Sequence, residues 1–225
     1  MTGRGEADRT AQPMDRATLL DRSLVARHTP PASMQTTPPP AGGPSARGSV
    51  IHGFRAAALE LWGEGALSLV GERLPLATRM ATLDEMVLPF EWLPLEHAIA
   101  WHDAVWAGPA RADEAELSHF IARSIDLGFG RFKSAFFANV TPERLVDRAQ
   151  ELWRYQHTHG EITVAIDGTT GTVTLRDHPY VGHATSRRVT AETYRHIVTL
   201  AGGKDVRTAW GVSGLTLVVQ LSWRA

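Results

Sequence analysis

The sequence contains ten histidines, and these are the residues that most suggest chemistry. His157 and His159 lie two positions apart in the stretch RYQHTHGEITVAI. On a strand their side chains would share a face and could bind one metal ion, whereas on a helix they would point about 200° apart. Thr141 and Pro142 are typical of a helix start and Gly160 of a helix end, so we place His157 in the last helical turn. There an imidazolium is stabilised by the helix dipole, and we predict no metal at this pair.

The other histidines do not form a metal-binding or catalytic pattern. His97 and His102 are five positions apart, a poor helical spacing for a shared ligand, and His102 falls on an apolar stripe typical of a core or pocket position. His178 and His183 flank a turn-like segment. The sequence has no H-E-x-x-H motif and no carboxylate pattern for a two-metal site. We predict no metal site, and a metal-dependent hydrolase built from dispersed histidines and carboxylates is the least favoured alternative.

Signatures of nucleophilic catalysis and of phosphate binding are absent from the sequence as well. Cysteine does not occur, which removes disulfides, thiolate ligands and thiol nucleophiles together. There is no G-x-S-x-G elbow, and the glycine-rich stretches before Arg131 and Lys204 are too short for a nucleotide loop. We therefore predict a protein that is not an enzyme.

Composition limits the class of protein and its partners. The chain has 225 residues, 43% of them hydrophobic, which suits one domain with a tail. The formal net charge of -1 gives no strong field to attract nucleic acid or an anionic membrane. No apolar run approaches the roughly 20 residues of a spanning helix, and the N-terminus lacks a signal peptide's apolar segment. We expect a cytoplasmic protein with neither nucleic acid nor membrane as a partner.

The chain divides into two regions of different composition. Residues 1–48 hold more than half of the prolines and no Phe, Trp or Tyr, which predicts a disordered tail. Within this tail, residues 14–27 could form a short amphipathic helix that docks on the domain or on a protein partner. Residues 49–225 hold all seven tryptophans and form a single predicted domain.

The period of the hydrophobic pattern changes within this domain. Spacings of three and four residues predict helices over 50–65, within 89–109 with Pro94 in the first turn, over 112–128 and over 141–160. From residue 161 a period of two predicts strands, first as a hairpin over 161–175 and then as two strands over 204–223. Between them we predict a helix that starts at Thr190 and ends at Gly202. The predicted fold class is α+β, with an N-terminal helical layer packed on a small antiparallel sheet that carries an inserted helix.

Four stretches in this order resemble a family of uncharacterised proteins greatly expanded in myxobacteria: GFRAAALELWGEG, IDLGFGRF, ERLVDRAQELWRYQHTHGEITVA and YRHIVTLAGGKDVRTAW. More distantly, the layout is similar to the haem-nitric-oxide/oxygen-binding fold and to vinyl-reductase-type ligand sensors. The Tyr-x-Ser-x-Arg motif that holds haem propionates is missing, and so are the cysteines common in the second group. The resemblance implies a sensor-like fold, for which we predict no cofactor. Haem is the alternative, and it would require His102 or His119 as the proximal ligand.

The favoured function is a non-enzymatic small-molecule-sensing or protein-interaction domain. A small apolar ligand would lie in a crevice between the helical layer and the sheet. The alternative is a scaffold or adaptor that acts through homo- or hetero-oligomerisation, with the tail on a protein partner and a homodimer formed through an edge strand ending at Trp223. The residues expected to line the ligand site are Trp101, His102, Phe132, Phe136 and Trp153.

Overall fold

The structure is a computed structural model, and it describes residues 42–129 and 140–224. Most of the predicted tail, including residues 14–27, therefore lies outside the described residues, and so do Phe132 and Phe136. The folded chain begins earlier than the expected boundary at 49, because Ser45–Arg47 already forms a buried strand.

The first half of the described chain is helical and contains one two-stranded ribbon. Its strands β1 and β2 pair antiparallel, which brings the start of the described chain beside the segment that precedes α4. The elements in order are β1 (Ser45–Arg47), α1 (Gly48–Trp62), α2 (Glu64–Gly71), α3 (Leu76–Arg79), the π-helical turn η2 (Met80–Asp84), β2 (Trp92–Pro94), α4 (Leu95–Ala107) and α5 (Glu114–Phe129).

The second half contains a four-stranded antiparallel sheet with the order β3-β4-β6-β5. Its elements in order are α7 (Pro142–Leu145), the 3-10 turn η3 (Val146–Arg148), α8 (Ala149–Gln156), β3 (Glu161–Asp167), β4 (Thr170–Arg176), the 3-10 turn η4 (Pro179–Gly182), α9 (Ala184–Leu200), β5 (Lys204–Ser213) and β6 (Thr216–Arg224). The predicted hairpin over 161–175 is confirmed as β3 and β4.

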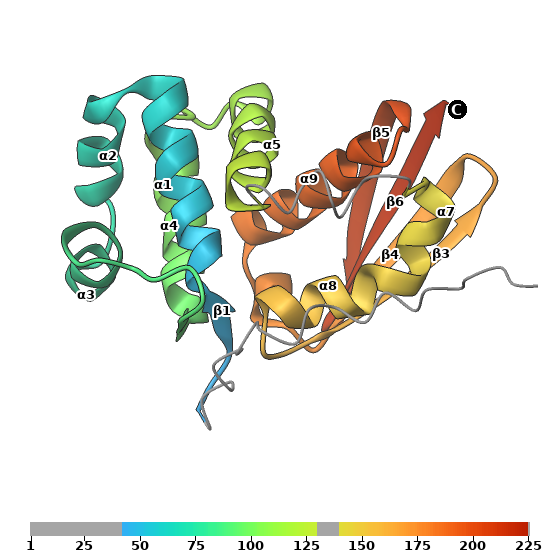
Figure 1. The fold of residues 1–225 in the computed structure, drawn as a ribbon, viewed down its shortest axis with the longest axis horizontal. Coiled ribbons are helices and arrows are strands. Elements are labelled where there is room, and N and C mark those ends of the chain that lie inside the picture. Colours follow the sequence, from blue (N-terminus) through green and yellow to red (C-terminus); the bar gives the residue numbers. More distant parts are fainter. Residues whose placement is uncertain (1–41, 130–139, 225) are drawn as a thin grey trace, which may run out of the picture. The chain divides into compact units, whose positions relative to one another are not determined.

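The layers follow from the alternation of buried residues along the strands. Figure 1 shows α1, α2, α4 and α5 gathered on one side, and the sheet with α8 and α9 on the other. Along β6, every second residue from Leu217 to Trp223 is buried, and this inner face packs against the helices. The described chain thus has the predicted α+β fold class, with α9 as the helix inserted between the two hairpins.

Glycines allow α1 and α5 to pack closely. A Cβ atom on Gly53 would lie 2.4 Å from the carbonyl oxygen of Ser124, and one on Gly128 would lie 3.3 Å from that of Ser49. At Gly53 only a residue without a side chain permits this approach of the two backbones, and at Gly128 a side chain would make a tight contact. The crossing places neighbouring side chains of both helices around one cavity, which is described below.

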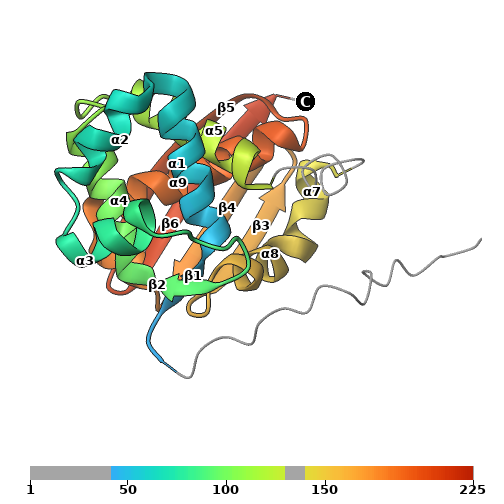
Figure 2. The ribbon, with the colours of Figure 1, turned by 60° about the vertical axis from the view of Figure 1, so that its left-hand side comes forward.

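The helix predicted over 141–160 is interrupted and ends early. It runs as α7, η3 and α8, and His157 is already extended, with φ -136° and ψ 145°. The reason is a tertiary contact: Ala46 of β1 forms a bridge with His157, and Thr158 N donates to Ser45 O at 3.1 Å. Figure 2 shows β1 beside the lower end of α8. Gly160 has the left-handed φ of +84° expected of a glycine at this turn.

Two further predictions about the last third were wrong. Helix α9 begins at Ala184, and Thr190 is an interior residue whose hydroxyl donates to Ser186 O at 2.8 Å. The strand ending at Trp223 is β6, which lies between β4 and β5 and has no free edge. Self-pairing through this strand is therefore excluded, because both of its sides already carry hydrogen bonds.

No helix within residues 42–129 and 140–224 is both long enough and apolar enough to cross a membrane.

Candidate ligand-binding cavity

A cavity of about 140 Å³ lies where the helical half meets the half that carries the sheet. It is bounded by α1, α5, α8 and α9, with single contributions from α4 and η4. The residues that line it are Ser49, Val50, Phe54, His102, Ile121, Ser124, Ile125, Gly128, Leu152, Trp153, Gln156, His157, Tyr180, Val189, Thr190, Thr193, Tyr194 and Ile197. We refer to it as the larger cavity, in contrast to a space of about 40 Å³ that adjoins it.

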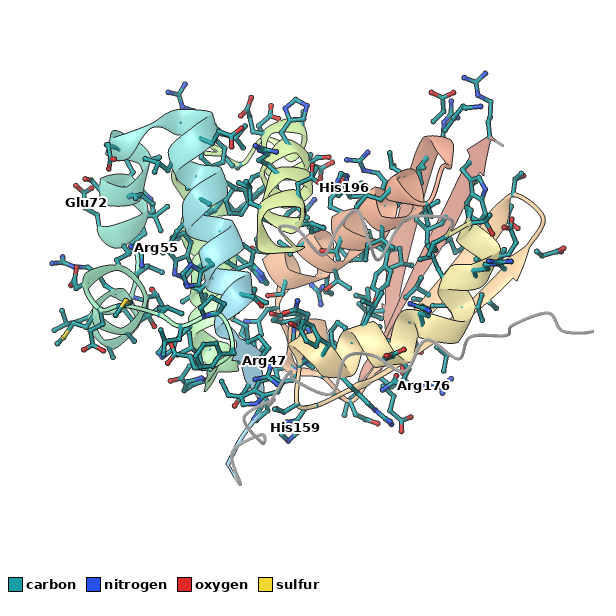
Figure 3. The ribbon with its side chains drawn as sticks, viewed as in Figure 1. Arg47, Arg55, Glu72, His159, Arg176 and His196 are labelled. Atoms are coloured by element: carbon teal, nitrogen blue, oxygen red, sulfur yellow. The ribbon has the colours of Figure 1, made fainter. Side chains whose placement is uncertain are left out.

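Polar contacts hold the helices that surround the larger cavity. Across α5 and α9, His196 Nε2 lies 2.9 Å from Asp126 Oδ1, and Ser118 Oγ donates to Glu192 Oε2 at 2.7 Å. Figure 3 shows His196 on the side of α9 that faces α5. Between α1 and α8, Ser49 Oγ donates to Gln156 Oε1 at 3.1 Å. The four walls are therefore connected in pairs.

His102 is the residue of α4 that reaches the larger cavity. It is 1% exposed, and its Nδ1 lies 2.9 Å from Ser186 Oγ on α9. Its ring packs against Phe54 and Tyr180, at centroid distances of 5.3 and 5.1 Å. Burial lowers the pKa of His102 to about 3, so this imidazole is neutral at physiological pH.

A cluster of four aromatic rings lies at one wall of the larger cavity, and three of them, those of Trp153, His157 and Tyr180, line it, whereas His178 packs against these three. His157 stacks on Trp153 at 4.0 Å and 19°, and His178 meets the Trp153 ring edge-on at 4.8 Å and 78°. Tyr180 completes the cluster, 4.4 Å from His178. The indole of Trp153 is fixed by a hydrogen bond from Nε1 to His159 O at 2.7 Å. We call Trp153, His157, His178 and Tyr180 the aromatic cluster.

Both imidazoles of the aromatic cluster are neutral. Burial lowers the pKa of His157 to about 3 and, together with the nearby histidines, that of His178 to about 2. The expectation that His157 is a helix-end cation is therefore wrong, since the chain leaves the helix before it and its ring enters the interior. His157 Nδ1 and His178 Nε2 are buried without a hydrogen-bond partner.

The unpartnered nitrogen of His178 has a physical account. Its Nδ1 accepts a hydrogen bond from Tyr180 N at 3.3 Å, so Nε2 carries the proton of the neutral ring. The rings of Trp153 and His157 lie nearly perpendicular to that of His178, at 78° and 85°, an arrangement in which an N–H group can approach a π-face. Contacts of this kind are weak, but they compensate in part for a missing acceptor.

The structure brings together two of the residues expected to line a ligand site. His102 and Trp153 both line the larger cavity, the first from α4 and the second from α8. Trp101 does not line it: its ring is fully buried, and its Nε1 donates to Thr82 Oγ1 at 2.8 Å. Phe132 and Phe136 lie outside the described residues.

Sequence reasoning missed the other lining residues of this site, among them three with polar aromatic rings: His157, Tyr180 and Tyr194. The signal for Tyr194 was present, because it lies on the inner stripe of the helix that the sequence predicted. His157 was placed at a solvated helix end, and Tyr180 in a turn, so neither position had a periodic pattern to indicate burial.

Haem, the cofactor of the distantly similar sensors, does not fit the larger cavity as these side chains build it. A cavity of about 140 Å³ is near the roughly 150 Å³ that accommodates benzene, far below the size of a tetrapyrrole. No Arg or Lys is among its described lining residues, so nothing there would pair with propionates. Of the two histidines considered as proximal ligands, His119 is exposed on α5 and does not line the cavity, and the ring of His102 packs against Phe54 and Tyr180, at centroid distances of 5.3 and 5.1 Å.

The part of the chain that the structure describes also contains no group of three or more His, Asp or Glu side chains placed to hold a metal ion. The two imidazoles of the aromatic cluster, those of His157 and His178, have no carboxylate partner among the hydrogen bonds and ion pairs of the described residues.

Comparison with known proteins identifies the fold. No family model and no curated protein matches the chain. Among solved structures, an Fe(II) unliganded H-NOX protein from K. algicida is similar with a TM-score of 0.57 and 6% identity, over 80% of this chain and 97% of that one. An oxygen-binding H-NOX domain related to soluble guanylate cyclases is similar with a TM-score of 0.54 and 9% identity, over 80% and 95%. A structure from a study of haem distortion in the H-NOX family has a TM-score of 0.56 and 10% identity over the same shares. The helical half, the sheet and the inserted helix α9 of this chain therefore form an H-NOX-like fold.

Proposed function

We propose that this chain is a non-enzymatic sensor domain that binds a small apolar molecule in the larger cavity. The single observation that carries the proposal is the position of this cavity between α1 and α5 of one half and α8 and α9 of the other. A bound molecule would contact both halves at once, and its binding energy would change how firmly they are held together.

The walls of the larger cavity favour an apolar ligand. The aliphatic and aromatic groups of residues such as Phe54, Ile121 and Ile197 provide most of its surface. Dry apolar cavities of about 150 Å³ bind benzene-sized molecules, because the ligand restores dispersion contacts that the empty space lacks. The structural similarity to H-NOX proteins supports a sensor at the level of fold only.

Thermal unfolding of the full chain with benzene or indole tests this proposal. A ligand present at about 100 times its Kd stabilises the native state by about 2.7 kcal/mol, which raises Tm by roughly 5–10 °C for a chain of this size. The matched control is Val189→Phe, which places a ring in the larger cavity from α9. We expect this variant to fold and to lose the Tm shift. If neither probe, nor any member of a panel of neutral lipophilic compounds, shifts the Tm of the wild type, the proposal is wrong.

A second candidate function is a scaffold or adaptor, and exposed apolar side chains favour it. Met86 is 84% exposed, Leu76 69% and Phe90 57%, all in α3 or in the segment that leads to β2. Exposed apolar residues that gather on one side of a protein often mark a binding surface for another protein. Light scattering of the full chain checks for self-association: a concentration-independent monomer that Met86→Glu and Phe90→Asp leave unchanged would count against a homodimer.

The proposal also places the chain in the cytoplasm, in keeping with a sequence free of cysteine. Cell fractionation checks this location, and recovery of the protein outside the cytoplasmic fraction would contradict it.

A further inference from the structure

A second, smaller cavity adjoins the larger one. It has a volume of about 40 Å³ and lies between α7, α8, α9 and the inner face of the sheet. Three residues line both spaces: Leu152, Tyr194 and Ile197. The remaining walls of the smaller cavity are Leu145, Ala149, Val164, Ile166, Gly171, Val173, Val198, Leu221 and Trp223. These three side chains, which we call the partition, therefore lie between a ring-sized space and a smaller, mostly apolar space that holds about one or two carbon atoms.

The partition can open at Leu152. This residue is only partly buried, whereas Ile197 on the facing helix α9 is 8% exposed. A leucine side chain moves between staggered rotamers without any change in the backbone. Rotation of Leu152 away from Ile197 would connect the two cavities.

The lining of both cavities selects against charge. No Asp, Glu, Lys or Arg is among the described residues that line either space. The two histidines of the larger cavity are neutral, because burial lowers the pKa of each to about 3. An ionised ligand would be buried without a counterion, at a cost far above what its apolar contacts return.

One polar group lies at the partition itself. Tyr194 is 9% exposed, and none of the hydrogen bonds of the described residues involves its hydroxyl, which is not among their fully buried unpartnered atoms and so keeps some accessible surface. Burial raises the pKa of this phenol, so the hydroxyl keeps its proton and acts as a donor. Because Tyr194 lines both cavities and its hydroxyl donates to no described residue, this hydroxyl is available to donate to an oxygen atom of a ligand at the junction.

We propose that the ligand is an uncharged molecule with three parts: a ring-sized body in the larger cavity, an oxygen that accepts a hydrogen bond from Tyr194, and a short alkyl arm that enters the smaller cavity past Leu152. This inference rests on the proposed function, since it specifies the class of ligand for the same site. Phenyl alkyl ketones have these three parts, and alkylbenzenes of equal chain length lack only the oxygen.

Calorimetric titration of the full chain with both series tests the inference. Acetophenone, propiophenone and butyrophenone extend the arm by one methylene at a time, and ethylbenzene, propylbenzene and butylbenzene are their counterparts. We expect the affinity for the ketones to rise about fourfold for each methylene that enters the smaller cavity, and to stop rising once this space is full.

Two variants separate the parts of the ligand. Tyr194→Phe should lower the affinity for each ketone about fivefold and leave the alkylbenzenes unchanged, since it removes only the donor. Val164→Ile adds one methylene from β3 to the smaller cavity, so it should abolish the gain from the longer arms and leave acetophenone binding unchanged. Val206→Ile on β5 is the matched control, because this residue lines neither cavity, and the chain-length series should persist in it.

The outcomes distinguish this inference from the proposed function. If benzene binds but the affinity does not change with chain length along the ketone series, no alkyl arm enters the smaller cavity, and the proposed function stands. If Tyr194→Phe weakens the binding of ketones and alkylbenzenes equally, Tyr194 contributes only to the shape of the wall, and the inferred hydrogen bond to a ligand oxygen is wrong. If neither benzene nor any ketone binds the wild type, the inference and the proposed function both fail.

Discussion

At the scale of single residues, three buried histidines in or beside the site stay neutral at physiological pH: His102 and His157 line the larger cavity, and His178 packs against His157. His102, His157 and His178 pack against aromatic rings, and burial is the main cause that lowers the pKa of each. A buried imidazole of this kind is a flat, moderately polar ring that fills space beside tryptophan and tyrosine. Its burial lowers the stability of the fold only at acidic pH, where the unfolded chain binds protons that the folded protein does not.

Acid should therefore destabilise the fold. In the unfolded chain these imidazoles become protonated as the pH falls below about 6.5. In the folded protein His102 and His157 become protonated only near pH 3. The unfolded state binds more protons across this window, so the free energy of unfolding falls as pH falls. Each of the three histidines contributes a slope of at most about 1.4 kcal/mol per pH unit. Urea unfolding between pH 7.5 and pH 4.5 measures this dependence.

His157→Phe isolates one of the three contributions. Phenylalanine keeps the stacked ring on Trp153, removes the unpartnered Nδ1, and cannot be protonated. We expect stability at pH 7.5 to stay the same or rise by up to about 1 kcal/mol, and the acid-dependent loss to shrink by about a third. His159→Phe is the control, because His159 is exposed two residues away. An unchanged acid dependence in His157→Phe would show that this imidazole is charged or solvated in the folded state.

Trp101 was expected to line the ligand site, but it is a residue of the hydrophobic core. Its indole donates to Thr82 in the interior and lines no part of the larger cavity. Trp101→Phe should cost roughly 1–3 kcal/mol of stability, from the lost hydrogen bond and the space left behind. The affinity for benzene should be the same as in the wild type, measured by calorimetry at a temperature where both are folded. A large loss of affinity would place Trp101 in the site after all.

At the scale of elements, β1 joins the two halves. Thr158 Oγ1 accepts a hydrogen bond from Ser45 N at 2.9 Å, and the buried Arg47 donates to Tyr155 O at 3.4 Å while its guanidinium lies 3.8 Å above the ring of Trp92. Figure 3 shows Arg47 and His159 near the same end of the molecule, where α8 ends. Contacts so distant in sequence end the helix at 156, a position that local propensity does not mark.

The packing of α1 on α5 permits a sharp test at the same scale. Gly53→Ala would place a Cβ atom 2.4 Å from the backbone oxygen of Ser124, so the helices must separate, at a cost of roughly 1–3 kcal/mol. Gly65→Ala in α2 is the matched control, because nothing lies within 4 Å of a Cβ atom there. Helix propensity predicts that this control gains up to about 1 kcal/mol. Chemical denaturation of both variants should give opposite signs, and equal effects would mean that the crossing is loose.

At the scale of the whole molecule, the sequence predicted what depends on local periodicity and missed what depends on distant contacts. The α+β layout, the β3–β4 hairpin and the glycine turn at Gly160 follow from hydrophobic period and turn residues. The central position of β6 and the inward turn of His157 do not, because each is set by a partner more than 30 residues away in the chain. Of the three expected site residues that the structure describes, His102 and Trp153 line the larger cavity and Trp101 does not, because a hydrogen bond to Thr82 holds its indole in the core.

A ligand in the larger cavity should stabilise both halves together. Its walls come from α1 and α5 on one side and from α8 and α9 on the other, so a bound molecule adds contacts to each. Hydrogen exchange of the full chain, measured with and without saturating benzene, tests this prediction. A local opening that breaks the ligand contacts must also release the ligand, so the bound ligand slows exchange through that opening. We expect slower exchange in α5 and in α9, and no change in α2, which lies away from the cavity lining. Protection confined to α8 and α9 would instead mean that the ligand binds one half alone, and the chain would then lack the means to couple ligand binding to the contact between its halves.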